Sequence, residues 1–196
     1  MTVAKQKMTV EEYLSYDDGT DNRYELVDGE LVLVGAESKL NAQIAMFLVA
    51  CFLDIGIPHY LLSTKVELVV SSRKATTRSP DLVVLTDVLE ALLDNAYRYI
   101  VESDMPAPQL VVEVVSPGVP GEQNYDRDYV EKRQEYAERG ISEYWLIDPQ
   151  RQVVWVLTLQ AGAYHQQSFT GQTAISSPTF PNLSLTASQV LGAGRP

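Results

Sequence analysis

The sequence has little of what many reactive and metal-binding sites are made from. Its 196 residues include one cysteine and two widely separated histidines. One thiol cannot form an internal disulfide, and this set offers no zinc site. The thiol, Cys51, lies in the run MFLVACFL and is interpreted as a buried core residue. The chain also has no glycine-rich phosphate loop and no serine with a histidine partner, which counts against nucleotide-loop and serine-hydrolase chemistry.

Basic residues and long apolar runs are also scarce. There are 15 Lys and Arg against 26 Asp and Glu, for a formal net charge of −11, and residues 151–196 contain two Arg and no acid. This balance argues against a passive, charge-driven binder of nucleic acid or anionic membranes, but it suits carboxylates that hold a divalent cation. The longest apolar run, residues 44–53, is too short to span a membrane, and the first residues lack a signal-peptide core. We therefore expect a cytoplasmic protein without a membrane partner.

What is present is an ordinary globular composition, with 45% hydrophobic residues, 11 Gly and 10 Pro. We expect one domain over residues 1–196, with a core at about 8–150 and a C-terminal β-hairpin extension at 151–196. Helices and strands alternate without repeats, which predicts an α/β (α+β) fold with a mixed sheet flanked by helices. The expected helices cover residues 38–55, 87–104 and 126–139, with short ones from Thr9 and at 186–191; the expected strands cover 60–70, 81–85, 109–115 and 143–147, with hairpins at 23–34 and 152–169 and a basic loop at 71–79.

Two carboxylates break the apolar pattern of their strands. Asp81 opens the strand in SPDLVVL, and Glu113 lies inside LVVEVVSP. A carboxylate in a buried strand is costly unless it is paired or holds a metal ion. A salt bridge or a strand-end capping role would explain either residue alone. Because adjacent strands lie about 4.8 Å apart, the two carboxylates could instead share one cation.

A candidate cation lies on the helix DRDYVEKRQEYAERG. Lys132 is flanked by Glu131 and Glu135, so spacing alone also allows a solvated helix surface. Asp128, one turn earlier, either holds Lys132 in place or faces solvent.

The order of several short motifs resembles a known family. TVEEYL, RYELVDGEL, RSPDLVVL, LVVEVVSP and the run from Asp128 through Lys132 to EYWLIDP span residues 8–150. Their order and spacing resemble the Uma-type endonuclease family, a branch of the PD-(D/E)XK nuclease superfamily. The resemblance implies a restriction-endonuclease-like fold and a metal-dependent endonuclease that cuts DNA phosphodiester bonds. Because superfamily members often dimerise, we also expect a homodimer, with the hairpin of Trp155 and Tyr164 as a candidate pairing edge.

The resemblance also implies a set of catalytic residues. Asp81 would be the acid of the PD element and Glu113 the acid of the next strand. Val115 stands where the superfamily has lysine, and Lys132 on the following helix would replace that lysine. Asn41 stands in the region where the family often has histidine.

Chemistry adds roles to these positions. Asp81, Glu113 and the main-chain carbonyl of Val114 would hold Mg²⁺, or Mn²⁺, which prefer oxygen ligands. Lys132 would orient the attacking water or stabilise the developing negative charge. Glu25 matches a recurrent acidic position; it would complete the catalytic set, pair with Arg23 at the hairpin edge, or only set the strand register.

Contacts to DNA are expected from the basic loop before the PD element. Arg73, Lys74 and Arg78 are the candidates for phosphate positioning, although such a loop can also serve solubility alone. Two other functions remain open: a nuclease-fold binding module that no longer cuts, and a two-carboxylate sugar hydrolase. The buried strand positions and Lys132 argue against the sugar hydrolase.

Overall fold

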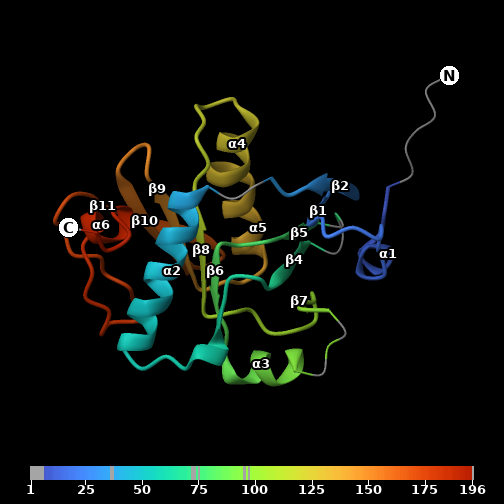
Figure 1. Cartoon of the computed structure of the whole chain (residues 1–196), viewed down its shortest axis with the longest axis horizontal. Helices are drawn as coiled ribbons and strands as arrows, with labels where there is room; N and C mark the ends of the chain where they lie inside the picture. The colour runs from blue at the N-terminus through green and yellow to red at the C-terminus, as the bar shows by residue number, and fades with distance from the viewer. Residues whose placement is uncertain are drawn as a thin grey trace.

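A six-stranded mixed sheet forms the centre of the computed structural model, which describes residues 7–35, 38–71, 74, 76–94, 96 and 98–195. The strand order is β11-β10-β9-β8-β6-β3, with helices on both faces (Figure 1). The strands are β3 (Leu62–Ser63), β6 (Leu82–Val84), β8 (Leu110–Val114), β9 (Glu143–Asp148), β10 (Val153–Gln160) and β11 (Ala163–Phe169). The predicted fold class, a mixed sheet flanked by helices, is confirmed.

The helix predicted at 126–139 connects the last two core strands. Strands β8 and β9 are parallel neighbours, and parallel neighbours need a long connection between them. This connection is α4 (Gln123–Asp126), the π-helical turn η2 (Arg127–Glu131) and α5 (Lys132–Glu138). The helix predicted at 126–139 therefore contains a turn in which the backbone is wound more loosely than in an α-helix.

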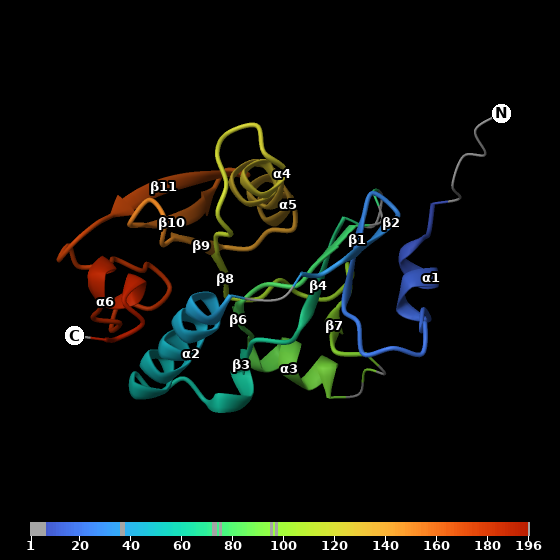
Figure 2. The ribbon, with the colours of Figure 1, turned by 45° about the horizontal axis from the view of Figure 1, so that its top comes forward.

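The two faces of the sheet are covered by different helices (Figure 2). Leu110, Val112 and Val114 of β8 pack in the core on the side of α2 (Lys39–Asp54) and α6 (Ala187–Leu191). Val111 and Val115 pack in the core on the side of α3 (Asp87–Leu93) and α5. Because successive side chains of a strand alternate between faces, Glu113 lies on the α5 side.

Smaller sheets flank the central one. Strands β4 (Glu67–Ser71), β5 (Thr76–Arg78) and β7 (Ile100–Val101) form one sheet, and the hairpin β1 (Tyr24–Val27) and β2 (Glu30–Leu33) forms the other, next to α1 (Val10–Leu14). Asp28 and Gly29 have φ of 49° and 80°, the positive values that a two-residue hairpin turn requires, within the hairpin predicted at 23–34. The backbone N–H of Leu26 donates to Thr77 Oγ1 at 2.8 Å, which fixes β1 beside β5.

Several predicted boundaries are wrong. The strand predicted at 60–70 is a 3₁₀ turn, η1 (His59–Leu61), followed by β3 and β4, which belong to different sheets. Ser63 Oγ accepts the N–H groups of Lys65 and Val66 and turns the chain between these strands. The basic loop contains β5, and the helix predicted at 87–104 ends at Leu93, before β7. The C-terminal hairpin pairs with β9, so it continues the central sheet.

Side-chain burial bears on two further predictions. Cys51 is only partly buried, although it packs against the core on the α2 side. Trp155 and Tyr164 both face the α5 side, where Tyr164 is buried, while β11 is the outermost strand of the sheet, so pairing of two copies through this hairpin stays a prediction. None of the helices in the described residues has the length and apolar character that a membrane crossing requires.

Candidate active site

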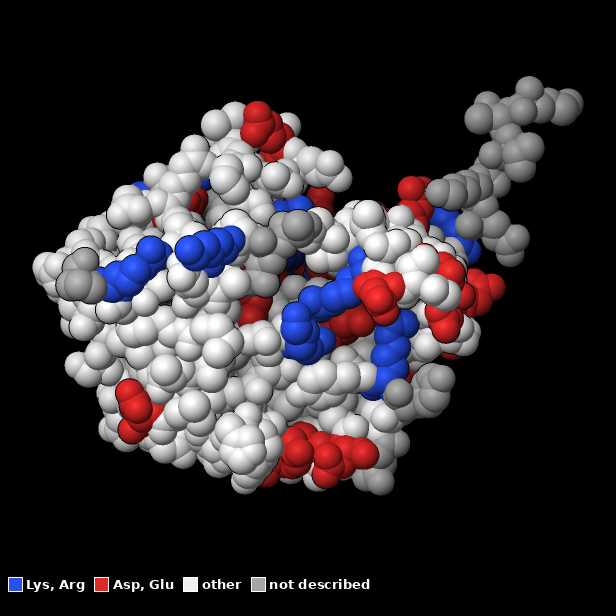
Figure 3. Space-filling model, viewed as in Figure 1, with Lys and Arg blue, Asp and Glu red and all other residues white. Residues whose placement is uncertain are grey.

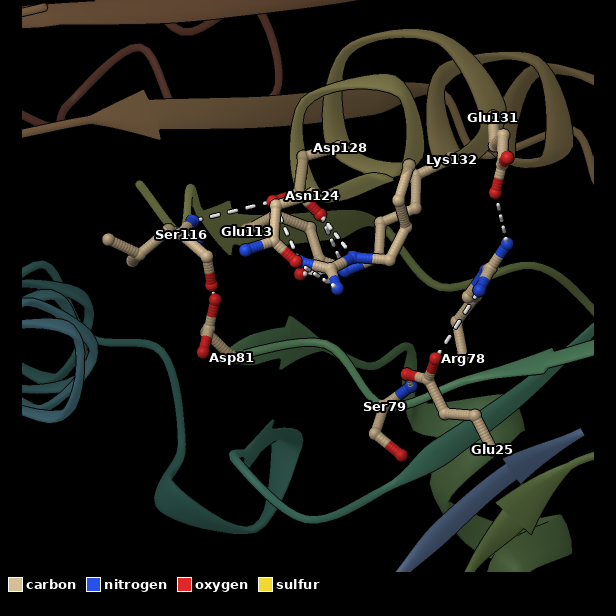
Figure 4. A network of polar contacts seen from close by, with 12 residues as sticks. Glu25, Arg78, Ser79, Asp81, Glu113, Ser116, Asn124, Asp128, Glu131 and Lys132 are labelled. Atoms are coloured by element: carbon tan, nitrogen blue, oxygen red, sulfur yellow. Dashed lines mark hydrogen bonds and ion pairs between the residues drawn. The ribbon is translucent and has the colours of Figure 1, made fainter. Parts of the chain in front are cut away.

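Glu113 is a carboxylate enclosed in the middle of the fold. It is 3% exposed in strand β8, whose five residues are all buried. Its Oε2 accepts a hydrogen bond from Lys132 Nζ at 2.7 Å (Figure 4), and its Oε1 accepts one from the Tyr136 hydroxyl at 2.5 Å. Both oxygens therefore have donors, as a buried carboxylate requires.

Lys132 is the cation of this group. The alternative of a solvated helix surface is wrong, because Lys132 is 6% exposed and faces the sheet. Its Nζ also lies 3.5 Å from Asp128 Oδ1, and Asp128 is itself 2% exposed. Of the two alternatives for Asp128, the structure therefore supports the one in which it holds Lys132. The N–H of Lys132 bonds to the carbonyl of Arg127, five residues earlier, so the π-helical turn precedes the lysine directly.

Burial and neighbouring charges act differently on the two partners. Burial raises the pKa of Glu113 to about 7, against the lowering effect of Lys132, while Asp81 and Asp128 add to the rise. Burial opposes the charge on Lys132, but Glu113, Asp128 and Glu25 together hold its pKa above the usual range. Lys132 is therefore a permanent cation near neutral pH, where Glu113 titrates.

Asp81 lies next to this pair at the start of β6. The antiparallel register pairs Leu82 with Val112, and continuing it by one residue places Asp81 opposite Glu113. The Asp81 carboxylate also accepts the backbone N–H of Val114 at 2.6 Å, which is the strand-end role expected as an alternative. The two carboxylates that break the apolar pattern thus lie on adjacent strands at one end of the sheet (Figure 4).

The carbonyl of Val114 has a partner that sequence reasoning missed. Asn41, in the first turn of α2, donates from Nδ2 to this carbonyl at 3.0 Å. The residue that stands in the family's histidine region therefore contacts the carbonyl proposed as a metal ligand. The one signal that pointed to Asn41 was its place in the resemblance.

The donor set suits a magnesium ion. The Asp81 and Glu113 carboxylates and the Val114 carbonyl are oxygen donors, and each oxygen has more than one lone pair. In the part of the chain that the structure describes, no three His, Cys, Asp or Glu side chains are grouped as a metal site. A cation would therefore rely on two carboxylates, the carbonyl and solvent.

A second buried charge group lies beside the first. Arg78 is 1% exposed, and its Nε and Nη2 donate to Glu135 at 2.7 and 2.8 Å. Its Nη1 lies 3.3 Å from Glu25, whose other oxygen accepts the backbone N–H of Ser79 at 2.8 Å. Glu131 completes the group at 3.3 Å.

This second group corrects two expectations. Arg78 is not on an exposed basic loop, so its guanidinium binds carboxylates of the same chain. Of the alternatives for Glu25, the pairing is with Arg78 rather than Arg23. Lys74 is exposed, and Arg73 lies outside the described residues. Figure 3 shows acidic atoms at the bottom of a hollow near the middle of one face, with Lys and Arg side chains beside it.

Comparisons with known proteins give the family of the chain and a solved structure with a similar fold. The model of the Uma2 family, described as "Putative restriction endonuclease", matches residues 10–188. A crystal structure from Anabaena variabilis, described as "a putative nuclease belonging to DUF820", superimposes with a TM-score of 0.71 at 17% identity, covering 96% of this chain and 99% of that one. No curated protein matches the chain. At this identity the solved structure shows a shared fold.

Proposed function

This chain belongs to the Uma2 family, and on that basis we propose that it is a Mg²⁺-dependent endonuclease that hydrolyses DNA phosphodiester bonds. The observation that carries the proposal is the buried pair of Glu113 and Lys132, 2.7 Å apart, beside Asp81 on the next strand. Two acids and a lysine at the end of a sheet supply the oxygen ligands and the positive charge that phosphodiester hydrolysis needs.

The residues have distinct roles in this proposal. Asp81, Glu113 and the Val114 carbonyl would hold Mg²⁺ or Mn²⁺, which when bound lowers the pKa of water and neutralises charge on the phosphate. Lys132 donates to the attacking water or to the developing oxyanion. Asp128 positions Lys132, and Asn41 positions the Val114 carbonyl. Lys74, exposed between β4 and β5, would contact a phosphate of the substrate.

A plasmid-nicking assay with Mg²⁺ or Mn²⁺ tests this function. We expect the wild-type chain to nick DNA, and Asp81→Asn, Glu113→Gln and Lys132→Gln each to lose about 100-fold or more, the size of effect seen when one charge-stabilising group is removed. The matched control is Glu138→Gln, which makes the same change at an exposed carboxylate of α5. Cleavage retained by all three site variants would overturn the proposal, provided circular dichroism shows them folded.

A second function is favoured by one observation. Both Glu113 oxygens already accept hydrogen bonds within the chain, as in a nuclease fold that binds without cutting. Calorimetry with Mg²⁺ and Mn²⁺ separates the two functions. An active nuclease should bind metal in a way that Asp81→Asn and Glu113→Gln abolish, whereas an inert module should show no such binding.

A further inference from the structure

A cavity of about 290 Å³ lies between the helix that carries Lys132 and strands β9–β11, on the same face of the sheet as Glu113. Most of its wall is aromatic or aliphatic, and its polar side chains are few. The lining includes Tyr125, Tyr129, Trp155, Arg133 and Gln166. Ligand sites usually measure about 300–1,000 Å³, so this cavity has room for one planar ring system rather than a large molecule.

Two polar groups in the cavity wall have unused hydrogen-bond donors among the described residues. The indole Nε1 of Trp155 is buried and has no hydrogen-bond partner in the described residues. Leaving such a donor unpaired is costly, so an acceptor in the cavity that reached it after a shift of the indole ring would be stabilising.

Arg133 is the second of these groups. Among the described residues it has no carboxylate within ion-pair distance, as is also true of Arg139 and Arg195, whereas Arg78, Arg98, Arg127 and Arg151 each have at least one. Its Nη1 donates to Gln166 Oε1 at 2.6 Å and its Nη2 to the Tyr164 carbonyl at 3.3 Å. A guanidinium has five N–H donors, so it keeps donors and an uncompensated positive charge for an anion.

The tyrosines of the wall are arranged as a stack. The rings of Tyr125 and Tyr129 lie 4.5 Å apart with an interplanar angle of 15°. The Arg151 guanidinium lies 5.1 Å from the centre of the Tyr125 ring and 5.5 Å from that of Tyr129. Aromatic surfaces next to arginines are the platforms on which proteins stack unpaired bases.

The cavity is also close to the candidate active site. Leu146, in its wall, pairs in register with Glu113 on the neighbouring strand. Tyr129 follows Asp128 directly, so one turn of helix contributes to both places. A nucleotide near Glu113 could therefore place an adjacent part of its strand at the cavity.

We propose that this cavity binds an unpaired nucleobase of the substrate strand, with Tyr129 and Trp155 contacting the ring and Arg133 a phosphate. This inference rests on the proposed nuclease function, since it names how that site would recognise its strand. The ring acceptors of a base match the unpaired indole N–H, and the phosphate matches the uncompensated guanidinium.

Binding can be measured without cleavage, in EDTA, by anisotropy of a labelled single-stranded oligothymidylate. We expect wild-type binding that is much weaker for an abasic strand of the same length and charge. Tyr129→Ala should weaken binding about 5- to 150-fold, the range for losing one stacked base. Trp155→Phe keeps an aromatic ring and removes the N–H, and should weaken binding about tenfold. The matched control, Tyr60→Ala, removes an exposed tyrosine of η1 and should change nothing.

Intrinsic fluorescence locates the contact. The chain has two tryptophans, of which Trp145 is fully buried in the core on the α2 side, so quenching by the oligonucleotide should come from Trp155 and vanish in Trp155→Phe. Equal binding of the abasic strand, or unchanged binding in both cavity variants, would overturn the inference. Thymidine monophosphate that binds as tightly as the strand would make the ligand a free nucleotide, and would also overturn it. The binding assay in EDTA does not depend on cleavage, so its result is independent of the nicking assay. Base binding in EDTA together with no nicking in Mg²⁺ or Mn²⁺ would contradict only the nuclease proposal.

Discussion

Two neighbouring faces of the η2–α5 helix differ in how fully their charged and polar groups are paired. The face toward β8 is called the sheet side, and the face toward the β10–β11 hairpin is called the hairpin side. On the sheet side, Lys132 is buried between Glu113 and Asp128. On the hairpin side, the next residue, Arg133, has no carboxylate partner in the described part of the chain, and Trp155 has an unbonded N–H. A side whose charges are compensated stabilises the fold while it holds reactive groups, whereas a side with unused donors is suited to an external ligand.

The largest expected effect is the loss of the buried cation. Lys132→Met should lower the free energy of unfolding by about 3–5 kcal/mol at pH 8, because it leaves the Glu113 carboxylate without its counterion. The neighbouring Arg133→Met should cost less than about 1 kcal/mol, because it removes only two hydrogen bonds to neutral groups. Urea unfolding of both variants measures the contrast.

A double variant checks the cause. Lys132→Met combined with Glu113→Gln should recover much of the loss, since the Glu113 charge is removed together with its counterion and Asp128 keeps Arg127 as its partner. Equal losses for Lys132→Met and Arg133→Met would show that the two sides of the helix do not differ in the way described.

The next effect is a pH dependence of the free energy of unfolding, which should come from Glu113 on the sheet side. The pKa of Glu113 rises on folding from 4.5 to about 7, so the folded state binds more protons than the unfolded state between these values. Stability therefore falls as pH rises from about 4.5 to 7, by about 3 kcal/mol for this group, and then levels off. In Glu113→Gln the free energy of unfolding, measured by urea unfolding at each pH, should no longer fall between pH 4.5 and 7. A Glu113→Gln profile with the same slope as wild type would contradict the assignment.

The smallest effect comes from removing one hydroxyl on each side. Tyr136→Phe deletes a buried donor to Glu113 and should cost about 1.5–3 kcal/mol at pH 8, where that carboxylate is charged. Tyr129→Phe deletes a partly exposed donor to Asp148, which keeps Arg151 as its partner, and should cost less than about 1 kcal/mol. Thermal unfolding of the two variants at pH 5 and pH 8 tests this, since only Tyr136→Phe should depend on pH.

Local signals predicted much of the fold. Asp28-Gly29 between two alternating runs predicted the hairpin, and two apolar strands around a strong helix predicted the crossover. The strand predicted at 60–70 failed for a physical reason. Its alternation is genuine, but the Ser63 side chain bonds to the next backbone N–H groups, and the pairing of each half with a distant strand separates β3 from β4.

Only part of the candidate site could be predicted from the sequence. Glu113 could be recognised because one charge stood in an apolar strand, and Lys132 because of the family resemblance. Arg78 could not, because its partners Glu25 and Glu135 are 53 and 57 residues away in the sequence. Tyr136 lies one helical turn after Lys132, but nothing in the spacing indicated that its hydroxyl would meet Glu113.

The π-helical turn has a consequence for how insertions and deletions would act on this protein. Each residue of an α-helix advances the chain by about 100° around the axis, so η2 sets the rotational phase of everything after it. The Lys132 N–H bonds to the carbonyl of Arg127, five residues earlier, so η2 holds one residue more than an α-helical turn and deleting Val130 would let a regular turn form with little rotation of α5. Inserting one further residue would instead rotate α5 by about 100°. Lys132 would then leave Glu113 although every functional side chain was still present. The active constellation thus depends on a residue count as well as on residue identity, and substitution scanning alone would not detect that dependence.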